Sequence, residues 1–267
     1  MQRPAILLLL LLAGAAPQEP SLRDRIDAAV EALKIRDASV GIVVYSVQAG
    51  QAVYARNERT PLLLASNTKL LTTSAALARL GAGFRFRTSI GLLGDDLHVF
   101  AGGDPNISGR FHGDDPVAIF KEWAAKLRAA GVAKAGNLVL HTGIFDDVHL
   151  QPGWKDYDLW WWWSAPFGAL SLNDNCVDLR VEPGDEGEPL RVKLAPDTDY
   201  VTLVNQAKTS AKPKRAFGFT RAPGTNTVTL RGEAASRGTY WVAVHDPTVY
   251  FGTVLKETLA RSGIAVT

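Results

Sequence analysis

The sequence of 267 residues contains little cysteine, little net charge and few histidines. Cys176 is the single cysteine, which excludes an internal disulfide and a thiolate metal site, and we expect it to be a small buried apolar residue. The 29 basic and 27 acidic residues give a formal net charge of +2, which argues against a nucleic-acid partner. The five histidines lack metal-ligand spacing, so we expect no metal and no other cofactor.

Long apolar runs are also scarce, and the one present lies at the N-terminus. Arg3 precedes an uninterrupted apolar stretch at 5–13, and small residues follow to Ala16. This order is typical of a secretory signal peptide, whereas a helix that spans a bilayer needs about 20 apolar residues. We therefore expect residues 1–16 to be removed on export and the protein to lie in the periplasm or at the cell surface. Membrane association is expected to be peripheral at most, through an uncleaved segment.

Hydrophobic periodicity and turn residues indicate a helical opening segment followed by a longer region rich in strands. The expected elements are a helix at 21–33, a hairpin at 39–47 and 52–56, an apolar helix from 69 to 80, strands at 86–93 and 96–102, a helix from 116 to 130 and a strand at 137–142. Between 170 and 245 short strands alternate with turns, without a helix. A last helix is predicted from Pro247 to Arg261.

Ser66 and Lys69 stand three positions apart at the start of the apolar helix. Residues at this spacing lie about one turn apart on one face, so the ammonium can reach the hydroxyl. A lysine takes a serine's proton only when it is neutral, which requires burial or a second cation, and we expect leucines at 62–64 and 70–71 to supply the burial. The Ser66 N–H would be one donor of an oxyanion hole. The spacing alone equally allows a capping serine beside a solvent-facing lysine.

Residues 160–163 are four consecutive tryptophans. Four adjacent indoles cannot all be buried on one side of a strand or helix, so we expect part of the run to be exposed. A strand packed on both faces and a loop that faces a substrate are both left open by the sequence.

An ordered series of segments gives a more specific signal than the Ser/Lys spacing. The series includes Leu64-Ala65-Ser66-Asn67-Thr68-Lys69, Gly102-Gly103-Asp104-Pro105, Pro152-Gly153-Trp154, Ser164-Ala165-Pro166, Ser171-Leu172-Asn173-Asp174-Asn175-Cys176-Val177-Asp178 and Asp246-Pro247. On these segments, which extend over nearly the whole mature chain, the sequence resembles the low-molecular-mass penicillin-binding D-alanyl-D-alanine carboxypeptidases/endopeptidases with large inserted domains.

The resemblance implies an α+β fold in which a β-lactamase/transpeptidase-like catalytic domain is interrupted by a large, mostly β region. Residues 17–85 would be the first part of the catalytic domain, 86–245 the inserted region and 246–267 the return to the catalytic domain. A plain β-lactamase is disfavoured because this insertion is too long and too rich in strands.

The function that the resemblance implies is serine-type cleavage of D-alanyl bonds in peptidoglycan stem peptides through an acyl-enzyme, with β-lactams as covalent inhibitors. Ser66 would be the nucleophile and Lys69 the general base. Trp154 and Asp158 would help to recognise the stem-peptide side chain, although Asp156 stands where an aromatic residue is common. Whether terminal D-alanine or cross-links are cut is left open.

The resemblance also implies two further elements, Ser-x-Asn and Lys-Thr-Gly, beyond the last predicted helix. Ser171-Leu172-Asn173 and Lys208-Thr209-Ser210 look similar, but both fall in the inserted region, the first in a strand-like stretch and the second in an expected turn. We therefore expect this chain to be the N-terminal part of the enzyme, inactive alone or poorly folded in its first domain. The alternative is an exported, non-catalytic peptidoglycan-binding module of the same fold.

Overall fold

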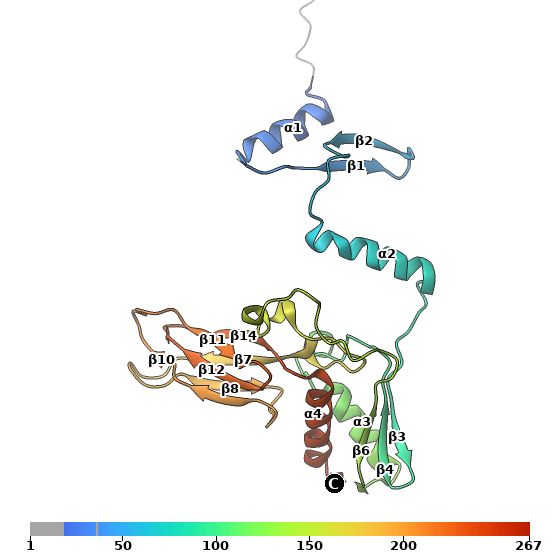
Figure 1. Cartoon of the computed structure of the whole chain (residues 1–267), viewed down its shortest axis with the longest axis vertical. Coiled ribbons are helices and arrows are strands. Elements are labelled where there is room, and N and C mark those ends of the chain that lie inside the picture. The colour runs from blue at the N-terminus through green and yellow to red at the C-terminus, as the bar shows by residue number, and fades with distance from the viewer. Residues whose placement is uncertain (1–18, 36) are drawn as a thin grey trace, which may run out of the picture. The chain divides into compact units, whose positions relative to one another are not determined.

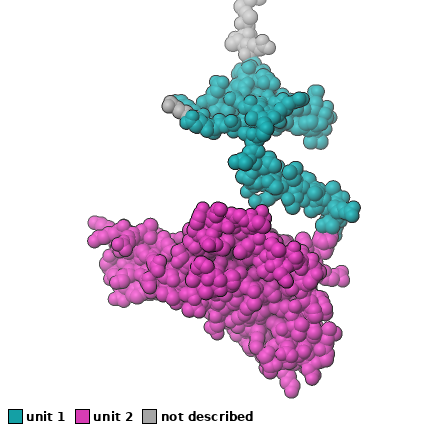
Figure 2. Space-filling model, in the orientation of Figure 1, with its two compact units in different colours: residues 1–83 teal, residues 84–267 magenta. Residues whose placement is uncertain are grey.

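The computed structural model describes residues 19–35 and 37–267, and the chain divides into two compact units, unit 1 (residues 1–83) and unit 2 (residues 84–267) (Figure 2). The expected signal peptide at 1–16 lies outside the described residues. None of the helices described in these ranges is both long and apolar enough to cross a membrane.

Unit 1 has the helices and the hairpin that the sequence predicts (Figure 1). Its elements are α1 (Leu22–Ala32), β1 (Ile42–Ser46), β2 (Gln51–Arg56), the 3-10 turn η1 (Ala65–Asn67) and α2 (Thr68–Leu80). A capping box begins α1, in which the Ser21 hydroxyl accepts from the Asp24 N–H and the Asp24 carboxylate accepts from the Ser21 N–H. β1 and β2 pair antiparallel, and Gly50, at φ 65°, supplies the left-handed residue of their turn.

Unit 1 buries little of its apolar surface. Tyr54 is the one buried residue among those described in this unit, and its hydroxyl donates to the Asp27 carboxylate. The leucines in and before α2 remain exposed; Leu63, for example, keeps 99% and Leu70 66% of its accessible surface. An apolar helix of this kind is normally covered in a folded domain. The contacts described within unit 1 therefore do not make a hydrophobic core.

Unit 2 begins with a small α/β part. Its elements are β3 (Ser89–Leu93), β4 (Asp96–Phe100), the 3-10 turn η2 (Gly109–Phe111), α3 (Ala118–Ala129), β5 (Lys134–Ala135), β6 (Leu138–His141), α4 (Pro247–Arg261) and β15 (Ala265–Val266). β4 lies between antiparallel β3 and parallel β6, and β5 pairs in parallel with β15. Helices α3 and α4 lie beside this sheet, with their apolar sides in one shared core (Figure 1).

The rest of unit 2 is mostly β, as the turn-rich sequence predicts. It contains the 3-10 turns η3 (Asp156–Asp158), η4 (Trp162–Ser164) and η5 (Asn173–Asn175), and the strands β7 (Cys176–Glu182), β8 (Arg191–Ala195), β9 (Thr202–Asn205), β10 (Lys208–Thr209), β11 (Gly218–Arg221), β12 (Thr227–Arg231), β13 (Glu233–Ala234) and β14 (Gly238–Ala243). β7 lies between β14 and β8, and β12 between β11 and β9. Apolar residues of β7, β11, β12 and β14 form a second core.

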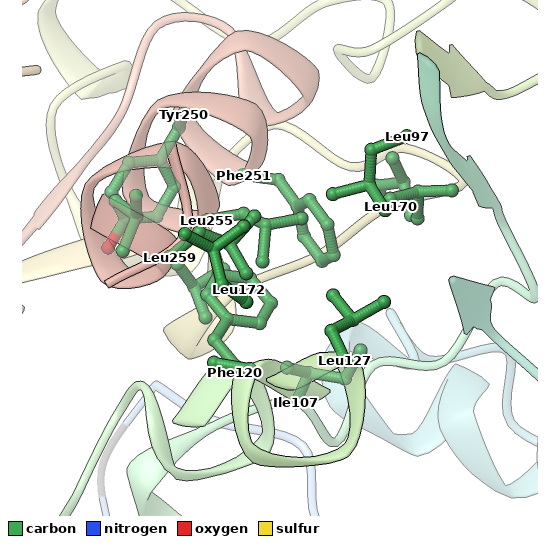
Figure 3. Packing of buried hydrophobic residues seen from close by; sticks show 14 of the residues in the cluster. Leu97, Ile107, Phe120, Leu127, Leu170, Leu172, Tyr250, Phe251, Leu255 and Leu259 are labelled. Carbon is green, nitrogen blue, oxygen red and sulfur yellow. The ribbon is translucent and has the colours of Figure 1, made fainter. Parts of the chain in front are cut away.

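The main core of unit 2 is built around one face of α4 (Figure 3). Phe251 meets Phe120 of α3 edge to face, with ring centroids 4.7 Å apart, and Leu255 is fully buried beside them. The helix begins where the sequence predicts, because the Asp246 carboxylate accepts from the Val249 N–H and Pro247 takes the first position.

Residues 246–267 pack against the residues that precede them in unit 2. They belong to this compact unit, and their expected assignment to the catalytic domain stays a prediction. Their contacts are long-range: α4 shares the core of α3, and β15 pairs with β5, a strand more than a hundred residues earlier.

Truncation of the α4 core should weaken unit 2. We expect Leu255→Ala to lower the free energy of unfolding by about 2–5 kcal/mol, since it removes a buried side chain and leaves a cavity. Val249→Ala on the same helix is the matched control, because Val249 keeps 52% of its surface, and it should change stability by about 0.5 kcal/mol or less. Urea unfolding followed by near-ultraviolet circular dichroism measures both, and equal effects would contradict this account of the core.

Limited proteolysis should separate the two units. Because unit 1 lacks a buried core, its backbone should open far more often than that of unit 2. Trypsin is expected to cut within 19–87 at least about tenfold faster than beyond it, leaving a resistant fragment that starts near residue 84. N-terminal sequencing of that fragment is the measurement, and a resistant product that retains residues 19–83 would sink the prediction.

Candidate active site

Ser66 and Lys69 are in contact, as the sequence predicts. Ser66 lies in η1 and Lys69 one turn later in α2, and Lys69 Nζ donates to Ser66 Oγ over 3.1 Å. The contact is short enough for proton transfer between the two groups. The N–H groups of a first helical turn have no acceptor within the helix, which leaves donors at this end for an anionic oxygen.

The backbone just before the serine takes an unusual conformation. Ala65 has φ 45°, in the left-handed region that residues with a Cβ rarely adopt. Such strain costs about 1–3 kcal/mol and gathers at functional sites. Ala65 connects the leucine-rich segment at 62–64 to the helical residues, and Ser66 is the next residue in η1.

The expected burial of this pair is not found. Both Ser66 and Lys69 are exposed, and so are the leucines at 62–64 and 70–71 that were expected to enclose them. The physical reason is that nothing described in unit 1 packs against this side of α2. The structure thus places the ammonium against the hydroxyl, but it leaves both groups in contact with solvent.

Trp154 and Asp158 belong to unit 2, in the segment that leads through η3 to the tryptophan run. Trp154 follows a turn in which its N–H donates to the carbonyl of Gln151, and both side chains are partly exposed. The carbonyl of Asp158 accepts from the Trp161 N–H at 2.9 Å and from the Ser164 hydroxyl. Their role in substrate recognition stays a prediction.

A buried arginine, which the sequence analysis missed, holds this segment against the second core. Arg221, 6% exposed, donates to the backbone carbonyls of Leu159 at 2.7 Å, Ala243 at 2.8 Å and Thr225 at 2.9 Å. Burial lowers the pKa of its guanidinium from the ordinary value. The residue lies at the end of a strand-like stretch with ordinary spacing, so nothing in the sequence indicated that it is internal.

The two segments that look similar to Ser-x-Asn and Lys-Thr-Gly have structural roles in unit 2. Asn173 is buried in η5, a 3-10 turn rather than the expected strand, and it bonds to the Cys176 carbonyl and Asp178. Lys208 and Thr209 form β10, paired with β13, where a turn was expected. Cys176 is buried, as predicted, and its burial raises the pKa of the thiol.

Comparison with known families identifies the family, which the geometry of one Ser–Lys contact alone does not. Residues 22–267 match the D-Ala-D-Ala carboxypeptidase 3 (S13) family, nearly the whole described chain. The chain belongs to that family. The resemblance inferred from the segments around Ser66 and Asp178 is thereby confirmed, and so is the α+β fold of a penicillin-binding protein.

Individual members of the S13 family are similar to this chain. A D-alanyl-D-alanine carboxypeptidase of Actinomadura sp. is 31% identical over 97% of this chain and 52% of that protein, and the carboxypeptidase DacB of Haemophilus influenzae is 29% identical over 55% of this chain and 32% of its own. The crystal structure of penicillin binding protein 4 (dacB) from H. influenzae matches with a TM-score of 0.68 at 20% identity, over 90% of this chain and 55% of that one. The same protein complexed with a β-lactam matches with a TM-score of 0.60. The chain spans about half the length of the relatives it matches.

Removal of the buried arginine should release the segment that carries Trp154 and Asp158. We expect Arg221→Met to destabilise unit 2 by about 3 kcal/mol, because three carbonyls lose their donor at about 1 kcal/mol or more each. Arg231→Met is the control, since Arg231 is exposed and bonds only to Gln206 within the described structure. Thermal unfolding compares the two variants, and a stable Arg221→Met protein would show that the clamp is dispensable.

Proposed function

We propose that this protein is a serine-type D-alanyl-D-alanine carboxypeptidase or endopeptidase that acts on peptidoglycan stem peptides. The observation that carries the proposal is the 3.1 Å hydrogen bond from Lys69 Nζ to Ser66 Oγ at the start of α2, in a chain of the S13 family. Residues 17–85 would be the first part of a transpeptidase-like domain, and residues 86–245 an insertion into it. Export to the periplasm or cell surface would bring the enzyme to its substrate.

The proposed reaction is acylation of Ser66 followed by hydrolysis, with Lys69 as the base. Ser66 Oγ attacks the carbonyl carbon of the bond before the terminal D-alanine, while Lys69 takes the hydroxyl proton. The carbonyl oxygen becomes an oxyanion, for which the N–H at Ser66 is a suitable donor. Collapse expels the D-alanine amine, which takes up the proton, and leaves an acyl-serine ester. Water then hydrolyses the ester and frees Ser66. A β-lactam would acylate the same oxygen, because its strained amide presents an equivalent carbonyl.

The exposure of Lys69 limits what residues 1–267 do by themselves. Lys69 is exposed, whereas a lysine that acts as a base needs burial or a second cation beside it. We propose that catalysis requires additional surface over α2, which would bury the leucines of this helix and the lysine together. The 267-residue chain alone would then bind β-lactams without efficient acylation.

Acylation by a fluorescent penicillin tests the proposal. The product of the complete reading frame, whatever its length, should become covalently labelled, and Ser66→Ala should abolish labelling because the acyl-accepting oxygen is gone. Lys69→Ala should slow labelling by roughly 10²–10⁴-fold, the usual contribution of a general base. Gel fluorescence over time provides the rates.

Matched controls lie on the same helix. Ser74→Ala and Arg79→Ala remove a serine and a cation from α2 without touching the pair, and both should label at the parent rate. If the complete product extends beyond residue 267, the purified 267-residue chain should label at least about a hundredfold more slowly than that product. Labelling that survives Ser66→Ala would refute the assigned nucleophile, and rapid labelling of the 267-residue chain would refute the need for added burial.

A further inference from the structure

Unit 2 contains a cavity that the catalytic pair does not use. Its volume is about 480 Å³, within the range of about 300–1,000 Å³ that small-ligand sites occupy. The lining combines two indoles, charged groups of both signs and a buried amide; the main contributors are Trp162, Trp241, Asp178, Asn173, Arg110 and Asp174. The cavity lies entirely within unit 2.

Two tryptophans form apolar walls. Trp162 keeps 56% and Trp241 50% of its surface in solvent, although tryptophan is a residue that proteins usually cover. Trp241 stands on β14 directly opposite Asp178 of β7, so both side chains lie on the face of the sheet that is turned away from the second core. Trp161, by contrast, packs on Phe219 in that core. The run of four indoles is therefore divided, and part of it is left free at the cavity.

The polar part of the lining is held in a fixed arrangement. Asn173 Nδ2 donates to Asp178 Oδ1 at 2.9 Å and to the Cys176 carbonyl at 3.3 Å, and Arg110 is paired with Asp174 at 2.5 Å. Asn173, Asp174 and Asn175 are three successive left-handed residues, with φ of 48°, 56° and 54°. Such a conformation requires support from its surroundings, and it is more frequent where a site must be preorganised.

Asp178 is a half-buried acceptor within this arrangement. Burial raises the pKa of its carboxyl group, and the hydrogen bond from Asn173 offsets part of that effect. A carboxylate has about four acceptor positions, of which Asn173 occupies one. The group is therefore ready to accept further hydrogen bonds from a ligand beside the Trp241 ring.

The charges restrict the ligand's chemistry. Two arginines, Arg110 and Arg180, and three acids line the cavity, so the formal net charge of the lining is one negative charge. The acids are Asp114, Asp174 and Asp178. A strong anion would meet the carboxylates, a cation would meet the guanidinium groups, and a fully apolar ligand would leave the open acceptor positions of Asp178 without a donor. A neutral ligand with an apolar face and several hydroxyl or amide groups satisfies all of these constraints.

We propose that this cavity binds an N-acetylhexosamine unit of a glycan strand. The C–H face of a pyranose ring would lie on the indole of Trp241 or Trp162, since the negative face of an aromatic ring attracts polarised C–H groups. Its hydroxyl and acetamido groups would exchange hydrogen bonds with Asp178, Asn173 and the arginines. A neutral sugar follows from the lining; the choice of an amino-sugar polymer rests on the proposed function.

Titration of the whole chain with N-acetylglucosamine trisaccharide, and with glycan strands freed of stem peptides by an amidase, tests the proposal. Tryptophan fluorescence should change on binding, and calorimetry should report the affinity. We expect Trp241→Ala to weaken binding about tenfold or more, and Trp241→Phe to restore part of it because a ring face remains. Phe145→Ala is the control, since Phe145 is another exposed aromatic side chain of unit 2, with 47% exposure, and does not line the cavity.

The outcomes separate this proposal from the catalytic one. Ser66→Ala should bind sugar as well as the parent chain does, so a failure of acylation leaves the sugar result standing, and the reverse also holds. Thermal melts identify a variant that has merely unfolded. The inference is overturned by absence of binding of these sugars to the parent chain, or by unchanged affinity of a folded Trp241→Ala protein.

Discussion

One face of α4 presents Tyr250, Phe251, Leu255 and Leu259, all of them fully removed from solvent. Burial of apolar surface at this scale is the main favourable contribution to folding, and here it connects distant parts of the chain. The face packs on α3 and β4, while the Tyr250 hydroxyl donates to the Cys176 carbonyl at the start of β7. The sheet of β7 and β14, whose residues Asp178 and Trp241 line the cavity, is thereby anchored to the α/β part of unit 2.

The Ser66–Lys69 contact depends on a different kind of constraint. Its geometry is local, since one turn of helix is enough to bring Nζ and Oγ together, and it forms in a unit without a core. The reactivity of the pair, in contrast, depends on residues outside this helical turn. A neutral lysine needs low dielectric or a second cation, and either must come from residues remote in sequence. This explains why the proposed catalytic pair can be recognised from one short segment, while its activity cannot be derived from that segment.

The sequence predicted well those features that short segments encode. The helix that begins at Pro247, the helix after Lys69 and the hairpin with its turn near Gly50 were all anticipated, because each depends on neighbours within a few residues. The features that it did not predict are long-range. β5 pairs in parallel with β15, and Arg221 joins the carbonyl of Leu159 to that of Ala243 at the end of β14, contacts that periodicity cannot relate.

The sequence likewise predicted one part of the candidate site and not the other. Ser66 and Lys69 were named from spacing and resemblance, whereas the cavity beside Trp241 arises from the register of β14 against β7 and from three left-handed residues. Asn173 was considered as part of a Ser-x-Asn element, because the tripeptide is visible in sequence and its burial is not. The hydrogen bond to Asp178 shows that this residue shapes the cavity instead.

A sugar site and a peptide-cleaving pair on one chain would act on one molecule. In peptidoglycan the stem peptide is covalently attached to the glycan, so a protein that holds the sugar also holds the peptide close by. The second contact then becomes intramolecular, at an effective concentration set by the length and stiffness of the connection, which is millimolar for short flexible links. Even weak binding at the cavity would thus enrich stem peptide near the chain without increasing the intrinsic affinity of the Ser66 site. The two functions would contribute to one reaction while remaining separable by substitution, since their residues belong to different units.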